Sequence, residues 1–147
     1  MLSTIDFATN ALRRSQLYRR HIAMDAEFVT LGDSVVVSRY GTLEQEQEQQ
    51  QDLTQAQHLG LVDLSTLPRA GFKGQGTPDW ATSIGIDLPA QPNQAVMQSD
   101  GTLVARLSQS ELLLASNLDG LSESIVNANQ VALTEGVYSL PRSDSHS

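Results

Sequence analysis

The sequence predicts an α+β fold in which an antiparallel sheet has its helices packed on one face. Short stretches of alternating apolar and polar residues follow one another between residues 94 and 115, with turn residues and no helix between them. Segments with helical spacing lie outside that run, at residues 3–22, 77–84 and 118–126. Consecutive strands with helices segregated from them are typical of this fold class.

The N-terminal part of the chain is expected to contain one helix and a two-stranded hairpin. Apolar residues recur at helical spacing over residues 3–22. Residues 28–31 and 35–37 are typical of strands, and the pair Gly32-Asp33 between them is typical of a tight turn. We therefore predict two antiparallel strands joined at that pair.

A Glu- and Gln-rich segment at residues 44–58 follows the hairpin. Such residues form helices readily, and we expect a solvated helix or a linker, the alternative being an acidic interaction surface. The length of the chain fits one domain, which we place at residues 1–136 with a polar tail at residues 137–147.

The middle of the chain predicts a strand followed by a short helix. Residues 70–73 lie between a proline and a glycine and are typical of a strand. The helix is expected to have Thr77 as its cap, Pro78 in its first turn and Gly85 as its stop. Because so short a helix is marginal by itself, we expect Trp80 to dock it on the sheet.

Period-two alternation predicts three further strands, at residues 94–98, 102–107 and 111–115. A helix over residues 118–126, capped by Asn117 or Asp119, and a strand at residues 131–133 are expected to follow. The strand and helix periods together predict one buried face. The predicted core residues are Trp80, Leu103, Leu107, Leu113 and Ile125.

Composition excludes several classes of function. The formal net charge of −8 argues against nucleic acid or an anionic membrane as a partner. The chain has no cysteine, which excludes disulfides and a cysteine nucleophile. His21, His58 and His146 have no spacing suited to a shared metal, so no metal site is expected. No apolar run is long enough to span a bilayer, and we expect a cytoplasmic protein.

Short motifs follow one another along the chain in a distinctive order. They are Leu17-Tyr18-x-x-His21, Ala26-x-Phe28-Val29, Tyr40-Gly41, Gly60-Leu61-x-Asp63-Leu64-Ser65, Gly71-Phe72-x-Gly74, Asp100-Gly101-x-Leu103 and Glu111-Leu112-Leu113-Leu114. In this order they resemble the N-terminal portion of the aminomethyltransferases, the T-proteins of the glycine cleavage system. They also resemble the related gamma subunits of heterotetrameric sarcosine oxidases. The resemblance implies the fold of the N-terminal folate-binding domain of the T-proteins.

The resemblance also implies a chemistry, the transfer of a one-carbon unit from an aminomethyl carrier to tetrahydrofolate as the cofactor. The aspartate of the family's Asn-Asp-Val segment matches Asp87, the candidate catalytic residue, while Ile86 stands in the place of the asparagine. A positioned and desolvated aspartate can act as a general base or stabilise an iminium cation. The alternative is that Asp87 is a turn residue that bonds its own backbone.

Three functions follow from these observations. We expect a short, non-catalytic aminomethyltransferase-like protein linked to folate-dependent glycine or sarcosine metabolism, because most folate-holding residues of the T-proteins have no counterpart in this sequence. The alternatives are an active folate-dependent transferase assembled as an oligomer or with a second chain, and a generic interaction module with an inherited fold. A homodimer or a subunit of a larger complex is also expected, because one copy would leave an apolar face uncovered. The strand at 131–133 or the Tyr138 segment is expected to pair across the two-fold axis.

Overall fold

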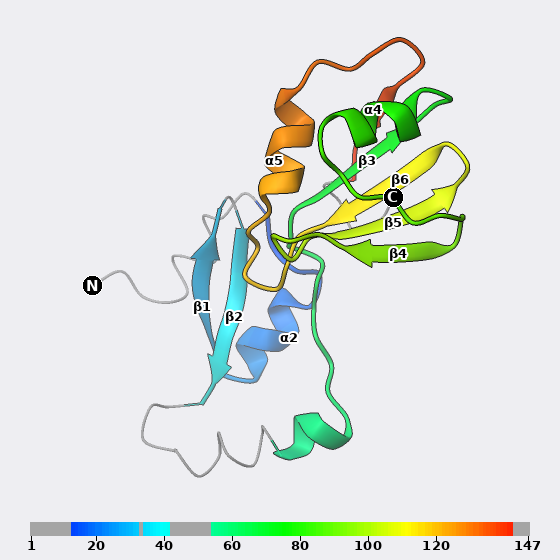
Figure 1. Cartoon of the computed structure of the whole chain (residues 1–147). Coiled ribbons are helices and arrows are strands. Elements are labelled where there is room, and N and C mark those ends of the chain that lie inside the picture. The colour runs from blue at the N-terminus through cyan, green and yellow to red at the C-terminus, as the bar shows by residue number, and fades with distance from the viewer. Residues whose placement is uncertain (1–12, 33, 42–53, 143–147) are drawn as a thin grey trace. The chain divides into compact units, whose positions relative to one another are not determined.

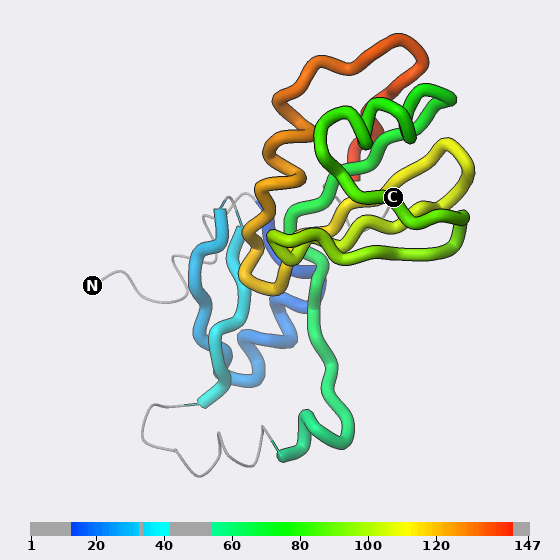
Figure 2. Tube along the Cα trace, viewed as in Figure 1, coloured from blue at the N-terminus to red at the C-terminus, as the bar shows by residue number. Residues whose placement is uncertain are grey.

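The chain forms two compact units, Met1–Thr66 (unit 1) and Leu67–Ser147 (unit 2), where the sequence predicts one domain over residues 1–136 (Figures 1 and 2). The structure, a computed structural model, describes residues 13–32, 34–41 and 54–142. Helices and antiparallel sheets make up the two units, so the predicted α+β class is confirmed. Across these described ranges, no helix is both long and apolar enough to cross a membrane.

Unit 1 contains α2 (Tyr18–Ala23) and an antiparallel hairpin of β1 (Ala26–Leu31) and β2 (Ser34–Tyr40). The predicted hairpin is confirmed, with the turn at Gly32, whose φ of +59° glycine adopts at no steric cost. Much of the Glu- and Gln-rich segment lies outside the described residues, but residues 54–58 are helical.

The long helix predicted over residues 3–22 is wrong at residues 13–17, and residues 3–12 lie outside the described part. Arg13 forms a parallel bridge with Ser34, and its carbonyl accepts a hydrogen bond from Val35 N at 3.3 Å. Leu17 N donates to Ser15 Oγ at 2.9 Å. Pairing with β2 and a local serine bond thus replace the helical pattern before Tyr18.

Unit 2 contains a five-stranded antiparallel sheet in the order β4-β5-β6-β3-β7 (Figure 1). The strands are β3 (Arg69–Lys73), β4 (Gln94–Met97), β5 (Leu103–Ser108), β6 (Glu111–Ala115) and β7 (Tyr138–Leu140). The first four match the predicted strands. The last one lies within the segment that the sequence predicts as a polar tail.

The strand predicted at residues 131–133 is wrong, because this segment is held against a helix and not against the sheet. Trp80 Nε1 donates a hydrogen bond to the carbonyl of Ala132 at 3.3 Å. Val137 is buried in the core, and the chain then turns into β7, where Tyr138 pairs with Lys73.

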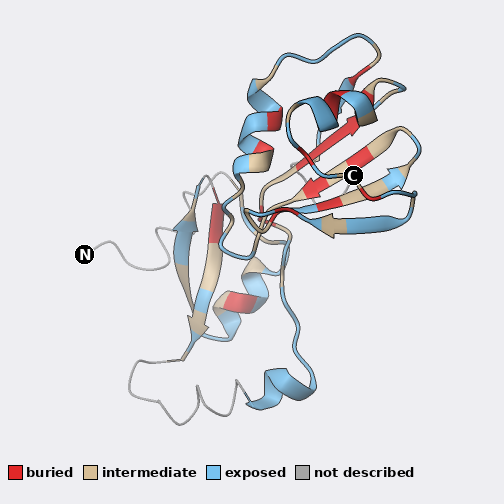
Figure 3. Cartoon of the chain, viewed as in Figure 1, coloured by how far each residue is buried: buried red, intermediate tan, exposed pale blue. Residues whose placement is uncertain are grey.

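Both helices of unit 2, α4 (Thr77–Ser83) and α5 (Glu123–Gln130), pack on one face of the sheet, as predicted. Figure 3 shows buried residues on these helices and on the central strands. The core of this face consists of Ala70, Phe72, Trp80, Ala81, Ile86, Val104, Leu112, Leu114, Ile125, Ala128 and Val137.

Trp80 and Ile125 are core residues as predicted, but the prediction was wrong for Leu103, Leu107 and Leu113. Val104 pairs with Leu114, which pairs with Ala70 on the next strand, and this row faces the helices. Side chains alternate along a strand, so Leu103 and Leu113 point to the opposite face. Leu107 lies where the pairing of β5 with β6 shifts register, and both Leu103 and Leu107 are exposed.

Helix α5 begins later than predicted, because its cap is Ser122 and not Asn117 or Asp119. The Ser122 hydroxyl accepts a hydrogen bond from Ile125 N at 2.9 Å. Asp100 Oδ2 accepts from Ser124 N at 2.8 Å, which places a carboxylate at the positive end of the helix.

Helix α4 has the predicted proline in its first turn and stops as predicted, with Gly85 at a φ of +83°. The predicted cap, Thr77, instead lies inside the helix and is buried. Gly76 precedes it as the N-cap residue without a side-chain bond.

Candidate functional site

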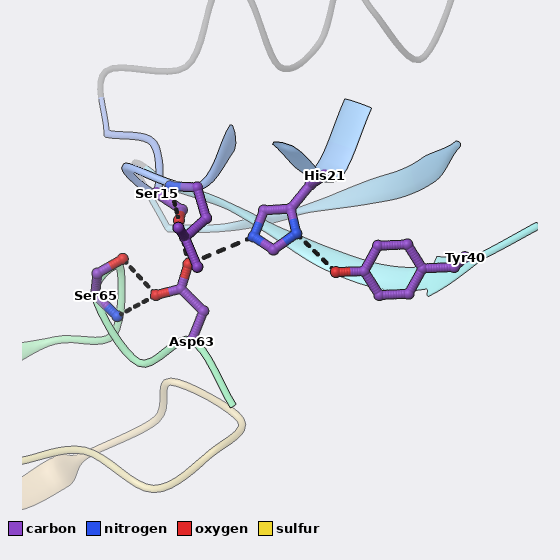
Figure 4. A network of polar contacts seen from close by, with 6 residues as sticks. Ser15, His21, Tyr40, Asp63 and Ser65 are labelled. Carbon is purple, nitrogen blue, oxygen red and sulfur yellow. Dashed lines mark hydrogen bonds and ion pairs between the residues drawn. The ribbon is translucent and has the colours of Figure 1, made fainter. Parts of the chain in front are cut away.

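Five polar side chains of unit 1 form one network around the carboxylate of Asp63, and we call them the Asp63 cluster (Figure 4). They come from the segment before α2, from α2 itself, from the end of β2 and from the segment that follows the helical residues 54–58. The cluster therefore ties together parts of unit 1 that lie far apart in the sequence. Its members are Ser15, His21, Tyr40, Asp63 and Ser65.

The short helix α2 aims His21 into the unit. Tyr18 and His21 are three residues apart and so lie on one face of the helix. The Tyr18 ring packs against Phe28 of β1 with a centroid distance of 5.6 Å, and His21 is buried. This aromatic contact fixes the helix on the hairpin and holds the imidazole in place.

Asp63 is the centre of the hydrogen-bond network. Ser15 Oγ donates to Asp63 Oδ2, and the hydroxyl and backbone N of Ser65 donate to Oδ1 at 2.6 and 3.0 Å. His21 Nε2 lies 3.5 Å from Oδ2. Burial alone raises the pKa of Asp63, but hydrogen bonds from these three partners outweigh it and lower the pKa to about 2. Asp63 is therefore ionised at neutral pH.

His21 connects this carboxylate to a phenol. Its Nδ1 lies 2.6 Å from Tyr40 Oη, and its Nε2 faces Asp63. With a carboxylate beside Nε2, we assign the proton of the neutral ring to Nε2, so Nδ1 accepts from the Tyr40 hydroxyl. Burial raises the pKa of Tyr40, and the charge of Asp63 raises it further.

The order carboxylate, imidazole, hydroxyl is that of a proton relay, but the phenol holds its proton more tightly than usual. A raised pKa disfavours Tyr40 as a nucleophile. The Tyr40 residue is 42% exposed and is the most accessible member of the Tyr40–His21–Asp63 chain. Within residues 13–32, 34–41 and 54–142, no group of three His, Cys, Asp or Glu side chains is placed to hold a metal ion. The arrangement is suited to fixing the four segments of the Asp63 cluster together.

Asp87, the catalytic candidate from the sequence, lies in unit 2 and is exposed. The buried Gln98 side chain holds its backbone: Gln98 Oε1 accepts from Asp87 N at 2.9 Å, and Gln98 Nε2 donates to Asp87 O at 3.0 Å. The preceding Ile86 fills the core, which gives a packing reason for an apolar residue there. A catalytic role for Asp87 stays a prediction.

Sequence reasoning named four of the five members of the Asp63 cluster only as parts of motifs, did not name Ser15, and found for His21 no spacing suited to a shared metal. The signal was present, because His21, Tyr40, Asp63 and Ser65 all belong to the motifs given above. No model of a known protein family matches this sequence, and no curated protein matches it. The resemblance to the aminomethyltransferases therefore rests on the motifs themselves.

Unit 1 is expected to lose stability in acid through Asp63. The folded-state pKa of about 2 lies below the ordinary value of 3.8, so the stabilisation is complete above pH 3.8 and is lost as pH falls through 2. The shift corresponds to at most about 2 kcal/mol. Hydrogen exchange of the β1–β2 amides measures the effect between neutral and acidic pH.

Two variants distinguish the contribution of Asp63 to the acid dependence of stability from that of another carboxylate in unit 1. Asp63→Asn is expected to open the hairpin more easily at neutral pH and to flatten its acid dependence. Asp25→Asn is the matched control, because Asp25 is exposed and has a φ of +52° that asparagine tolerates. Equal pH profiles for the wild type and Asp63→Asn would contradict the assignment.

Proposed function

We propose that this chain is a non-catalytic, subunit-type relative of the aminomethyltransferase and sarcosine-oxidase-gamma group, linked to folate-dependent metabolism of glycine or sarcosine. The observation that carries the proposal is the convergence of separate motifs in the Asp63 cluster. His21, Tyr40 and Asp63 come from three motifs and contact one another through side chains. Motifs that arose by chance would have no reason to meet in one network.

The motifs of unit 2 also occupy defining positions of its fold. Phe72 of the motif Gly71-Phe72-x-Gly74 is among the most buried side chains and packs on Trp80. Asp100 accepts hydrogen bonds from Thr102 N and Ser124 N, and Gly101 has a φ of +80° in the turn before β5. These residues stabilise the fold, so they support a similar fold to that of the aminomethyltransferase group more than a shared catalytic activity.

The exposed position of Asp87 supports a non-catalytic role. A carboxylate that acts as a general base or faces a developing cation works best when it is desolvated and positioned. Asp87 is exposed, and its neighbour Ile86 is a core residue in the place of the family's asparagine. The exposed acid thus lacks the polar neighbour that accompanies it in the T-proteins.

One observation favours the second candidate, an active transferase completed by another chain or copy. Gln98 fixes the backbone of Asp87 on both sides, so the carboxylate has a defined place on the surface. Arg106 Nη1 holds the following loop by donating to the carbonyl of Pro89 at 3.1 Å. A partner that covered this loop would desolvate an acid that is already positioned.

A folate assay distinguishes these candidates. The purified chain is mixed with an aminomethyl carrier and tetrahydrofolate, and formation of methylenetetrahydrofolate is measured. We expect no product from the wild type. Product that disappears in Asp87→Ala and persists in the control Asp79→Ala, another exposed acid of unit 2, would establish the transferase instead.

Calorimetric titration with tetrahydrofolate tests the folate link itself. Binding without turnover agrees with a non-catalytic folate-linked subunit. If neither the chain alone nor its mixture with the carrier protein binds tetrahydrofolate, the folate link fails and a general interaction module remains.

A further inference from the structure

The last strand of the unit 2 sheet is short and lies at its edge, and we call residues 135–142, which contain it, the C-terminal strap. Strand β7 forms only three residue pairs, all with β3, so its departure would break no other pairing. Of the strap residues, Val137 alone belongs to the core, and Tyr138 is 63% exposed. Segments that bury so little apolar surface open locally while the rest of a protein stays folded.

An ion pair that crosses a strand fastens the far end of the strap. Arg142 Nη2 donates to Glu111 Oε1 at 2.9 Å, and Glu111 begins β6, on the other side of β3. The Arg142 side chain passes over Gly71 of β3, where an added Cβ would lie 2.8 Å from Arg142 Cγ. The two charged side chains are 25% and 29% exposed, so water screens the pair only in part. The ion pair therefore ties the strap to a strand with which β7 does not pair.

The near end of the strap lies against the turn that leads from β3 into α4. An added Cβ on Gly76 would lie 2.8 Å from the carbonyl oxygen of Glu135, and Gly76 N donates to Gly136 O at 3.3 Å. These contacts are made by backbone atoms, so they define the place of the strap without burying an apolar side chain. Val137 and the ion pair are left as its two side-chain anchors.

We propose that the C-terminal strap detaches as a unit while the rest of unit 2 stays folded, and that an extended segment of another polypeptide can then pair with β3 in its place. After detachment β3 is still paired with β6, and its side chains still pack against the helices. Its outer N–H and C=O groups bind an added strand through the main chain, and side-chain sites give the specificity.

The strap itself defines the chemistry of the segment that would replace it. Glycine is required at the position of Gly136, whose φ is +76° and whose carbonyl faces the turn. An apolar residue is required at the position of Val137, and a cation at that of Arg142 to pair with Glu111. This inference goes beyond the proposed function and does not depend on it.

Hydrogen exchange of the full chain, followed by NMR, tests whether the strap detaches. The amides that bond β3 to β7 are expected to be at least about tenfold less protected than those between β5 and β6. Arg142→Ala is expected to lower the protection of the β3–β7 amides by about tenfold more, because it removes the ion pair and leaves the core intact. Arg142→Lys keeps the positive charge and should have a smaller effect.

The amides between β5 and β6 are the internal control for these variants. Their protection is expected to be the same in the wild type and in Arg142→Ala. Equal protection of both sets of amides in the wild type would overturn the proposal. Loss of protection by the same factor in both sets in Arg142→Ala would also overturn it, because the ion pair would then stabilise the whole unit.

Disulfide trapping tests whether β3 accepts a segment from another molecule. The chain has no cysteine, so Lys73→Cys introduces a single thiol at an exposed position opposite Tyr138. Directly opposite residues of antiparallel strands have the Cα separation that a disulfide requires. The probe is a synthetic peptide of residues 135–142 with Tyr138→Cys, activated as a mixed disulfide with thionitrobenzoate. The thiolate of the chain attacks the peptide sulfur, and thionitrobenzoate leaves as a thiolate that is measured by its absorbance.

A second peptide that also carries Val137→Asp is the control, because it cannot fill the apolar site. With the Lys73→Cys chain, the first peptide is expected to react at least about tenfold faster than the control peptide, because pairing raises its effective concentration. With Asn129→Cys, an exposed position on α5, the two peptides should react equally. Equal rates of the two peptides with Lys73→Cys would overturn the proposal. Circular dichroism checks that every variant is folded, and folate plays no part in either test, so this proposal and the proposed function succeed or fail separately.

Discussion

Replacing Trp80 with alanine is expected to lower the free energy of unfolding of unit 2 by about 3–5 kcal/mol. The side chain is only 3% exposed, and its ring lies 4.7 Å from that of Phe72, measured between centroids. Its removal leaves a cavity between α4 and the sheet. It also leaves the carbonyl of Ala132 without the indole donor that binds it.

Urea unfolding followed by far-ultraviolet circular dichroism measures this loss, since the variant lacks the chain's single tryptophan as a fluorescent probe. Trp80→Phe is the graded control: it keeps an aromatic ring in the core, loses only the hydrogen bond and part of the volume, and should cost less than half as much. An unchanged unfolding midpoint in Trp80→Ala would mean that α4 does not depend on this contact.

Replacing Gly74 with alanine is expected to destabilise unit 2 by about 3 kcal/mol or more. Gly74 has a φ of +123°, a conformation that residues with a Cβ rarely adopt. An added Cβ would lie 1.9 Å from the carbonyl oxygen of Gly136, so the backbone that leads into β7 would have to move. Backbone cannot rotate away as a flexible side chain can.

Gly85→Ala separates the cost of the positive φ from the cost of the clash with Gly136. Gly85 also has a positive φ, +83°, but an added Cβ would meet nothing within 4 Å. This control should therefore show only the conformational cost, about 1–2 kcal/mol. Thermal unfolding of both variants measures the difference. Equal losses would show that contact with Gly136 adds nothing.

The sequence predicted four of the five strands of unit 2 but not which of their faces is buried. The period of two places Leu103 and Val104 on opposite faces, and both are apolar. In β6 the run Leu112-Leu113-Leu114 offers no polar residue to mark the solvent side. The buried face is the one on which α4 and α5 pack, and the alternation within the strands carries no information about where those helices lie.

The candidate site was predictable only in its parts. Motifs identified Asp63, His21 and Tyr40 as positions of interest, but their meeting depends on how the segment after residue 58 returns to α2. Strand β7 was missed for a similar reason. It has three residues, too few for a periodic signal, and its pairing with β3 joins distant parts of the chain.

The strand order has a consequence for incomplete chains. Strand β3 lies between β6 and β7, so both of its neighbours follow it in the sequence. Until Tyr138–Leu140 is in place, one side of β3 presents unpaired N–H and C=O groups, which are a template for pairing with other molecules. Proteolytic cleavage or a fusion junction between residues 131 and 137 would turn an interior strand into a sheet edge. Handling of the protein should therefore protect that connection, since loss of β7 would expose a strand edge and favour aggregation.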